Sequence, residues 1–138
     1  MKVFLEWLDE WYLGVEAIDR QHVQLVGLLN NIAESMGDEN TPGEDGEKVF
    51  GMVLHLHEET RQHFTDEEAV MRDHEYPELI EHHREHIMLL AELQEFIRDV
   101  EEGVRRFDYE ALVSLKHWLI NHVIDTDMAF ARYLERSE

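Results

Sequence analysis

Apolar residues recur at intervals of three and four along four segments of the chain, which is the periodicity of an amphipathic α-helix. The segments span approximately residues 18–36, 45–73, 78–102 and 108–135. No segment shows sustained alternation of apolar and polar residues, so the pattern requires no β-strand. Four helices with short connections predict an all-α, up-down-up-down four-helix bundle. Because 138 residues is an ordinary size for one domain, we expect residues 1–138 to form a single one.

Residues that break helices separate the four segments. An acidic run at 37–46 follows the first helix, Pro77 follows the second and Gly103 follows the third. Asp108 is a plausible N-cap for the fourth. Residues 1–17 lack helical periodicity and contain several aromatic side chains, so they predict an irregular aromatic leader before the bundle.

Composition narrows the functional classes. The chain has no cysteine, which excludes disulfides, zinc–thiolate sites and iron–sulfur clusters. Its 12 basic and 32 acidic residues give a formal charge of −20, which opposes binding to nucleic acid or to an anionic membrane. No apolar run is long enough for a signal peptide or a membrane span, so we expect the protein in the cytoplasm.

Ionisable side chains interrupt the apolar stripes of all four predicted helices. His63 and Glu67 are four residues apart, as are His82 and His86, so each pair shares one helix face. Burying such groups is costly unless they are paired or bound to a metal. The sequence therefore predicts one metal cage inside the bundle. Its candidate ligands are His22, His63, Glu67, His82, His86, His122 and Asp127.

Spacing alone does not decide which aspartate of the fourth helix is the ligand. Asp127 follows His122 by five residues, which rotates it by about 140° on an ideal α-helix. Either a local π-bulge or a shift of the backbone is needed to turn it inward. Asp125 is the competing candidate, but it is rotated by about 60° in the other direction.

The order and length of the motifs around these residues resemble the hemerythrin family, specifically the single-domain bacterial hemerythrins. The resemblance covers nearly the whole chain. The matching motifs are Trp7, Gly14-Val15, Ile18-Asp19-Arg20-Gln21-His22, His63-Phe64-Thr65-Asp66-Glu67-Glu68 with Met71, Tyr76-Pro77 followed by His82 and His86, and Trp118-Leu119-Ile120-Asn121-His122 with Asp127.

This resemblance implies a non-haem di-iron centre with an oxo or hydroxo bridge. It assigns His82, His86 and His122 to one iron, His22 and His63 to the other, and Glu67 and Asp127 to both. It thereby favours Asp127 over Asp125. The iron with two histidines keeps one open coordination position, where dioxygen would bind.

The function implied by the resemblance is reversible dioxygen binding for storage, transport or delivery, without enzymatic activity or catalytic residues. Reversibility requires a dry pocket around the open position. The residues expected to form it are Leu25, Phe64, Trp118, Leu119 and Val123. Dioxygen is the expected partner. The sequence specifies neither a protein recipient of oxygen nor a choice between monomer and homo-oligomer.

Other functions use similar sites. A hemerythrin-type oxidase, peroxidase or nitric oxide reductase would use the same cage, and so would an oxygen or redox sensor. A ferritin-like di-iron site is disfavoured, because such sites use Glu-x-x-His pairs and no histidine here has a glutamate three residues before it. Manganese, zinc and copper also suit imidazole and carboxylate ligands, so iron is implied by the resemblance alone.

Overall fold

The computed structural model describes residues 4–36, 46–104 and 107–137, excluding the side chains of residues 46, 123–125 and 137. Every regular element in these ranges is helical. The elements are η1 (Asp9–Trp11), α1 (Glu16–Met36), α2 (Gly46–Asp73), α3 (Leu79–Glu101), α4 (Tyr109–Asn121), the π-helical segment η2 (His122–Asp127) and α5 (Met128–Ser137). The predicted all-α class is confirmed.

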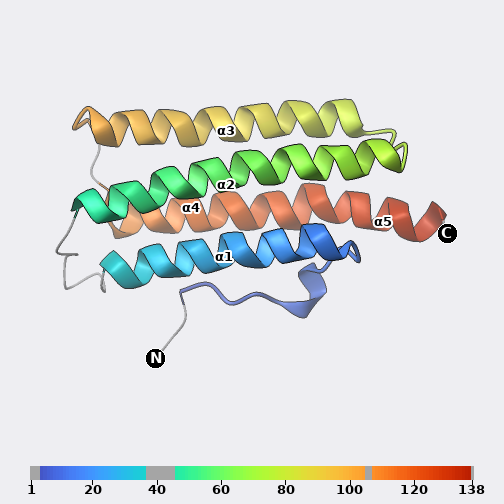
Figure 1. Cartoon of the computed structure of the whole chain (residues 1–138), viewed down its shortest axis with the longest axis horizontal. Coiled ribbons are helices and arrows are strands. Elements are labelled where there is room, and N and C mark those ends of the chain that lie inside the picture. The colour runs from blue at the N-terminus through green and yellow to red at the C-terminus, as the bar shows by residue number, and fades with distance from the viewer. Residues whose placement is uncertain (1–3, 37–45, 105–106, 138) are drawn as a thin grey trace.

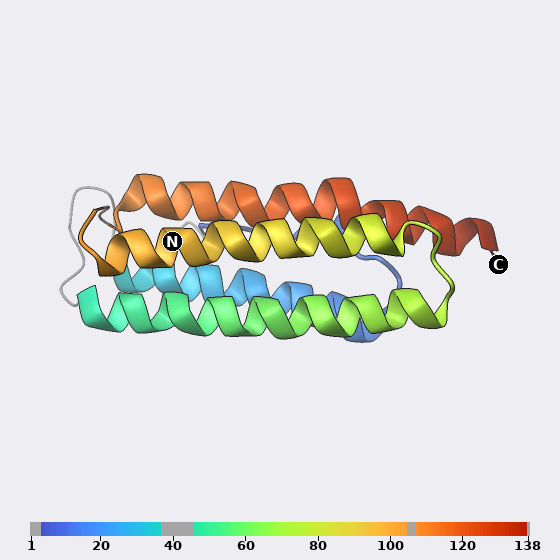
Figure 2. The ribbon, with the colours of Figure 1, turned by 90° about the horizontal axis from the view of Figure 1, so that it is seen from above.

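The helices form four rods with roughly aligned axes, and the chain direction alternates from one rod to the next (Figure 1). The fourth rod is built from α4, η2 and α5, which follow one another along a single axis in both views (Figures 1 and 2). This is the up-down-up-down four-helix bundle that the sequence predicts. None of the described helices combines the length and the apolar character that a membrane span needs.

The apolar stripes face one another and fill most of the length of the bundle. The buried side chains of this core include Leu25, Leu29 and Ile32 from α1, Val49, Val53 and Leu56 from α2, Leu93, Phe96 and Ile97 from α3, and Leu112, Leu115 and Leu119 from α4. Neighbouring helices are antiparallel, so early residues of α1 and α3 lie level with late residues of α2 and with η2 of the fourth rod. The ionisable residues occupy these positions, which places them together toward one end of the core.

The boundaries of the helices follow local chemistry. The side chain of Asp108 accepts a hydrogen bond from the backbone N–H of Ala111 at 2.9 Å, which confirms it as the N-cap of α4. Gly103 adopts a positive φ of 77° just after α3 ends. The fourth predicted helix, 108–135, corresponds to three consecutive helical elements because its hydrogen-bonding pattern changes at His122.

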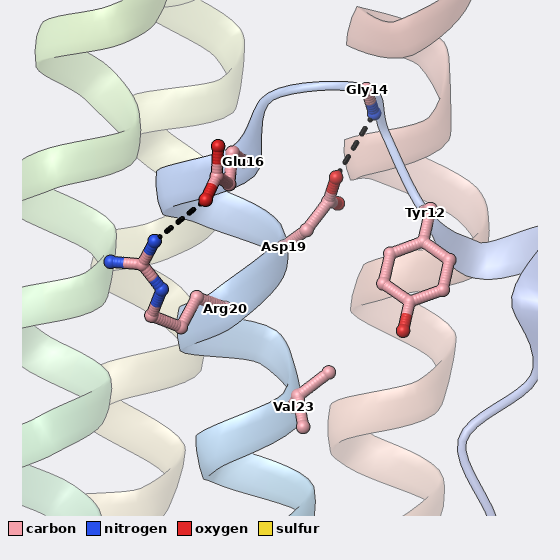
Figure 3. A pocket seen from close by; sticks show the side chains of 6 residues that line it. All are labelled: Tyr12, Gly14, Glu16, Asp19, Arg20 and Val23. Atoms are coloured by element: carbon pink, nitrogen blue, oxygen red, sulfur yellow. Dashed lines mark hydrogen bonds and ion pairs between the residues drawn. The ribbon is translucent and has the colours of Figure 1, made fainter.

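The leader contains the single turn η1 and lies along the outside of the bundle (Figure 1). Side chains of α1 and α4 hold it, and Lys116 of α4 donates to the backbone carbonyl of Phe4 at 2.9 Å. Asn30 makes two hydrogen bonds to the backbone of Leu5, at 2.8 and 2.9 Å. Asp19 is buried and accepts the backbone N–H groups of Leu13 and Gly14 at 2.7 and 3.1 Å. Figure 3 shows its carboxylate directed toward Gly14, whose φ of 93° permits the turn into α1.

Candidate metal centre

Seven buried side chains from all four rods converge inside the bundle. Their nitrogen and oxygen atoms form two groups in which every atom lies within 4.8 Å of the others. One group contains His82, His86 and His122 with Glu67 and Asp127, and the other contains His22 and His63 with the same two carboxylates. We call these the three-histidine half and the two-histidine half. The structure thus brings together all seven candidate ligands and divides the histidines as the resemblance implies.

The histidines turn their Nε2 atoms toward the two shared carboxylates. Nε2 of His82 lies 2.9 Å from Oε1 of Glu67 and 3.0 Å from Oδ1 of Asp127. Nε2 of His22 lies 2.9 Å from Oδ2 of Asp127, and Nε2 of His122 lies 3.1 Å from Oδ1. Donor atoms therefore surround a common centre. Glu67 and Asp127 lie at this centre and belong to both halves.

Many of these atoms approach one another without making hydrogen bonds. Among the residues that the structure describes, six atoms that face the centre are buried and make no hydrogen bond of ordinary geometry: Nε2 of His22, His63 and His122, Oε2 of Glu67, and both carboxylate oxygens of Asp127. Leaving a buried polar atom unsatisfied costs about 1–3 kcal/mol, and more when it is charged. Cations at the centre would satisfy all six atoms, and imidazole and carboxylate are suitable ligands for divalent transition metals. The residues present therefore fit a two-metal site.

The π-helical segment η2 explains how Asp127 enters this group. In π-helical geometry the hydrogen bonds connect residues five apart, so the side chain five positions after His122 returns to the same face. Asp127 is fully buried and lies beside His122. This is the π-bulge alternative raised by the spacing. The side chain of the competing residue, Asp125, lies outside the described residues.

Outer partners orient two histidines that lie on α2 and α3. The Nδ1–H of His63 donates to Oε1 of Gln21 at 2.8 Å, and the Gln21 amide donates to Asp66 at 2.6 Å. The Nδ1–H of His86 donates to Glu68 at 2.7 Å. Such bonds fix the ring so that Nε2 is free to face a metal.

His122 is oriented by a residue of η2 itself. Its Nδ1 lies 2.9 Å from the hydroxyl of Thr126, which also lies 3.1 Å from Oε1 of Glu85. The carboxylate of Glu85 is 3.6 Å from Nδ1 of His122. This contact with His122 holds the pKa of Glu85 below its ordinary value, in spite of the opposing effect of partial burial. The π segment therefore contributes an outer partner as well as a candidate ligand.

The pKa values of three histidines are raised. Burial alone would lower the pKa of His22 and of His82, but their contacts with Asp127 and Glu67 outweigh it and raise each to about 9. Burial opposes protonation of His122 as well, yet the charge of Asp127 and contacts with nearby carboxylates raise its pKa to about 10.

The pKa values of the remaining cage residues are lowered. Burial is the largest influence on the pKa of His63 and, despite the attraction of Glu67, lowers it to about 4. Burial would raise the pKa of Glu67 and of Asp127, but the surrounding histidines hold both well below their ordinary values. Without a metal, the site at neutral pH therefore contains ionised carboxylates and protonated histidines, and a cation would displace these protons.

Apolar and aromatic side chains cover the candidate ligands. Phe64 is buried and stacks on the ring of His86, with centroids 3.8 Å apart, whereas its centroid is 5.7 Å from that of His63. Leu25 and Leu119 are buried in the main core. Trp118 packs against the same core and has a buried indole N–H without a partner.

The predicted oxygen pocket is thus described in part. Phe64 stacks on His86 of the three-histidine half, and its ring centroid lies 5.7 Å from that of His63 in the two-histidine half. The side chain of Val123 lies outside the described residues. A narrow cavity of about 30 Å³ reaches His63 between α1 and α2, and apart from Leu25 its lining is polar, with Gln21, Gln24, Glu59 and Gln62. This cavity adjoins the two-histidine half.

The outer partners Gln21, Glu68, Glu85 and Thr126 were not predicted from the sequence. A signal existed for some of them, since Gln21 and Glu68 lie inside the motifs that carry the resemblance. Their contacts depend on the pairing of neighbouring helices, which spacing within one helix does not give. The histidines outside the cage are more exposed: His55, His74, His83 and His117 are on the surface and His57 is half-buried.

The chain resembles known proteins over nearly its whole length. Residues 13–134 match the family model described as the hemerythrin HHE cation binding domain. The chain is 29% identical over 129 residues to a bacteriohemerythrin of Stenotrophomonas maltophilia, covering 92% of this chain and 79% of that protein. It is 26% identical over 125 residues to a myohemerythrin of Theromyzon tessulatum, covering 91% and 89%.

The fold is shared with a solved structure as well. The crystal structure of a wild-type hemerythrin superposes with a TM-score of 0.81 at 18% identity, covering 94% of this chain and 96% of that one. A family model that spans nearly the whole chain, together with a bundle of the same fold, leads to one conclusion: the chain belongs to the hemerythrin family.

Proposed function

We propose that this chain holds two iron ions in the cage and binds dioxygen reversibly, as an oxygen store or carrier rather than as an enzyme. The observation that supports this most strongly is the cage itself. Two groups of donors share Glu67 and Asp127, and most of the atoms that face the centre are buried without hydrogen bonds. The family match supports a cation site, and the resemblance to hemerythrins supports iron over other metals.

The two halves of the cage offer unequal numbers of side chains. The three-histidine half has five and the two-histidine half has four. With fewer protein donors, the two-histidine half leaves room for a small ligand. A pair of ferrous ions held there would supply the two electrons that dioxygen takes up on binding and returns on release. The task of the chain is to hold both ions through Glu67 and Asp127 and to exclude water.

Exclusion of water separates reversible binding from oxidation. Leu25 and Leu119 are buried in the core, and Phe64 is buried against the histidines. The proposed pocket consists of Leu25, Phe64, Trp118, Leu119 and Val123. Its only side-chain N–H or O–H group is the Trp118 indole, so the pocket offers no acid that would protonate and release reduced oxygen. This composition favours a carrier over an oxidase.

Repeated oxygenation tests the proposal. Metal-free protein is loaded anaerobically with ferrous iron, and its visible spectrum is followed while oxygen is admitted and removed in cycles. A carrier gains a visible band with oxygen and loses it under vacuum over many cycles. A hemerythrin-type oxidase, peroxidase or reductase would instead pass to a stable oxidised form as a substrate is consumed, and that result would reject the carrier function.

A further inference from the structure

The two halves of the cage differ in the charge of their outer partners. In the three-histidine half, the carboxylate of Glu68 bridges two rings. It accepts from Nδ1 of His86 at 2.7 Å and from Nδ1 of His83 at 2.6 Å. The Glu68 side chain is only 14% exposed, while that of His83 is 54% exposed. A largely buried anion is therefore held directly behind the His86 ring.

A second carboxylate lies behind another histidine of the same half. Glu85 is 3.6 Å from Nδ1 of His122, and the Thr126 hydroxyl connects the two at 2.9 and 3.1 Å. Glu68 comes from α2 and Glu85 from α3, so two separate elements place negative charge behind this half.

Within the described residues, the outer nitrogens of the two-histidine half have no such charge in direct contact. The Nδ1–H of His63 donates to the neutral amide of Gln21. The carboxylate of Asp66 accepts from that amide and is therefore one hydrogen bond further from His63. Nδ1 of His22 is buried and has no hydrogen-bond partner in the described part of the structure. The ring of Trp7 packs against His22 instead, with centroids 5.9 Å apart.

An anion that accepts the outer N–H of an imidazole makes the inner nitrogen a stronger donor to a cation. Loss of such an outer partner typically lowers metal affinity by about 10–100-fold. A neutral amide orients the ring but adds no negative charge. Glu67 and Asp127 border both halves and therefore do not distinguish them.

We propose that Glu68 and Glu85 are positioning residues that make the three-histidine half the tighter cation site, so that the two metals load in a fixed order. The first cation occupies the three-histidine half, and the second completes the two-histidine half. This inference rests on the proposed function in one respect, which is that the cage holds two metal ions.

Stepwise metal binding tests the order. Metal-free protein is titrated anaerobically with ferrous iron in competition with a chromogenic chelator, which gives the two dissociation constants. In Glu68→Gln and in Glu85→Gln the tighter constant should weaken about ten-fold or more, with little change in the weaker one. Glu95→Gln is the matched control for charge, because Glu95 is exposed on α3 and away from the cage. The circular dichroism of each metal-free variant shows that the bundle is retained.

The reverse substitution adds a gain of affinity, which a damaged fold does not produce. Gln21→Glu, made together with Asp66→Asn so that the new carboxylate does not face Asp66 at 2.6 Å, should tighten the weaker step and leave the tighter one unchanged. Two indistinguishable steps in the unmodified chain, or equal shifts of both steps in the Glu68 and Glu85 variants, would overturn the inference. A chain that binds no iron would overturn the proposed function as well, whereas two bound irons without an oxygen response would contradict oxygen binding alone.

Discussion

His122 and Asp127 are five residues apart, yet Nε2 of the first lies 3.1 Å from Oδ1 of the second. An α-helix would turn these side chains about 140° apart. The π-helical segment that begins at His122 and ends at Asp127 removes this separation. One local change in helical hydrogen bonding therefore adds the second carboxylate to both halves of the cage.

Asp127→Asn should leave the bundle folded but prevent binding of two irons, because Asp127 is the carboxylate that borders both halves from the fourth rod. Iron per chain, measured after anaerobic loading and desalting, should fall below two. Asp125→Asn is the matched control and should still bind two. The opposite result, with loss of iron in the Asp125 variant alone, would show that the sequence alternative is the ligand.

Loss of Glu67 should reduce iron binding more than loss of His63. His63→Ala removes one of the two histidines of its half, so the second iron should be lost. Glu67→Ala removes a carboxylate common to both halves and should abolish stable binding of iron. His55→Ala, an exposed change on the same helix, should bind two irons. Two irons per chain and an unchanged oxygenated spectrum in the His63 and Glu67 variants would contradict the assignment.

Much of the site was predictable because it depends on one helical turn. The pairs His63–Glu67 and His82–His86 follow from a spacing of four residues, and the structure brings both pairs together. The direction of Asp127 was not predictable from spacing, since the choice between an α and a π turn depends on what the fourth rod packs against.

The outer partners of the histidines and the residues that cover the cage were harder to predict from the sequence. The contact between Glu68 and His86 joins two helices and requires their relative rotation. The attachment of Leu5 to Asn30 joins residues 25 apart without any periodic signal. Phe64 follows His63 directly, yet it stacks on His86, since the next residue on a helix faces a different neighbour.

Leu119→Ala should accelerate autoxidation. The side chain is 3% exposed, and its truncation leaves a space through which water can reach the cage. The substitution should also cost roughly 2–5 kcal/mol of the free energy of unfolding. Conversion of the oxygenated form to the oxidised form is followed spectroscopically.

Leu112→Ala separates stability from water access. Leu112 is 1% exposed and lies on the same helix, about 10 Å from Leu119 along the axis. Its truncation should have a similar cost in stability and little effect on autoxidation. Equal autoxidation rates in the Leu119 variant and the unmodified protein would reject the dry pocket.

The metal-free protein should lose stability as the pH rises above neutrality. The pKa values of His22 and His82 are raised to about 9 and that of His122 to about 10, above the ordinary value near 6.5. Their contribution to folding is therefore fully present below about pH 6.5 and is lost as the pH rises through 9–10.

The melting temperature of the metal-free protein between pH 6.5 and pH 10 measures this effect, and it should fall across the range. His122→Gln should reduce the pH dependence, because one of the three raised pKa values is removed. A melting temperature that stays constant or increases over this range would show that these histidines are not protonated in the metal-free fold.

The position of iron in the molecule tests the central claim most directly. Crystals of the anaerobically iron-loaded protein, measured at the iron absorption edge, give an anomalous difference map in which only iron produces strong peaks. We expect two peaks per chain, one in the three-histidine half and one in the two-histidine half, both bordered by Glu67 and Asp127. A single peak, or peaks away from these side chains, would contradict the two-metal cage.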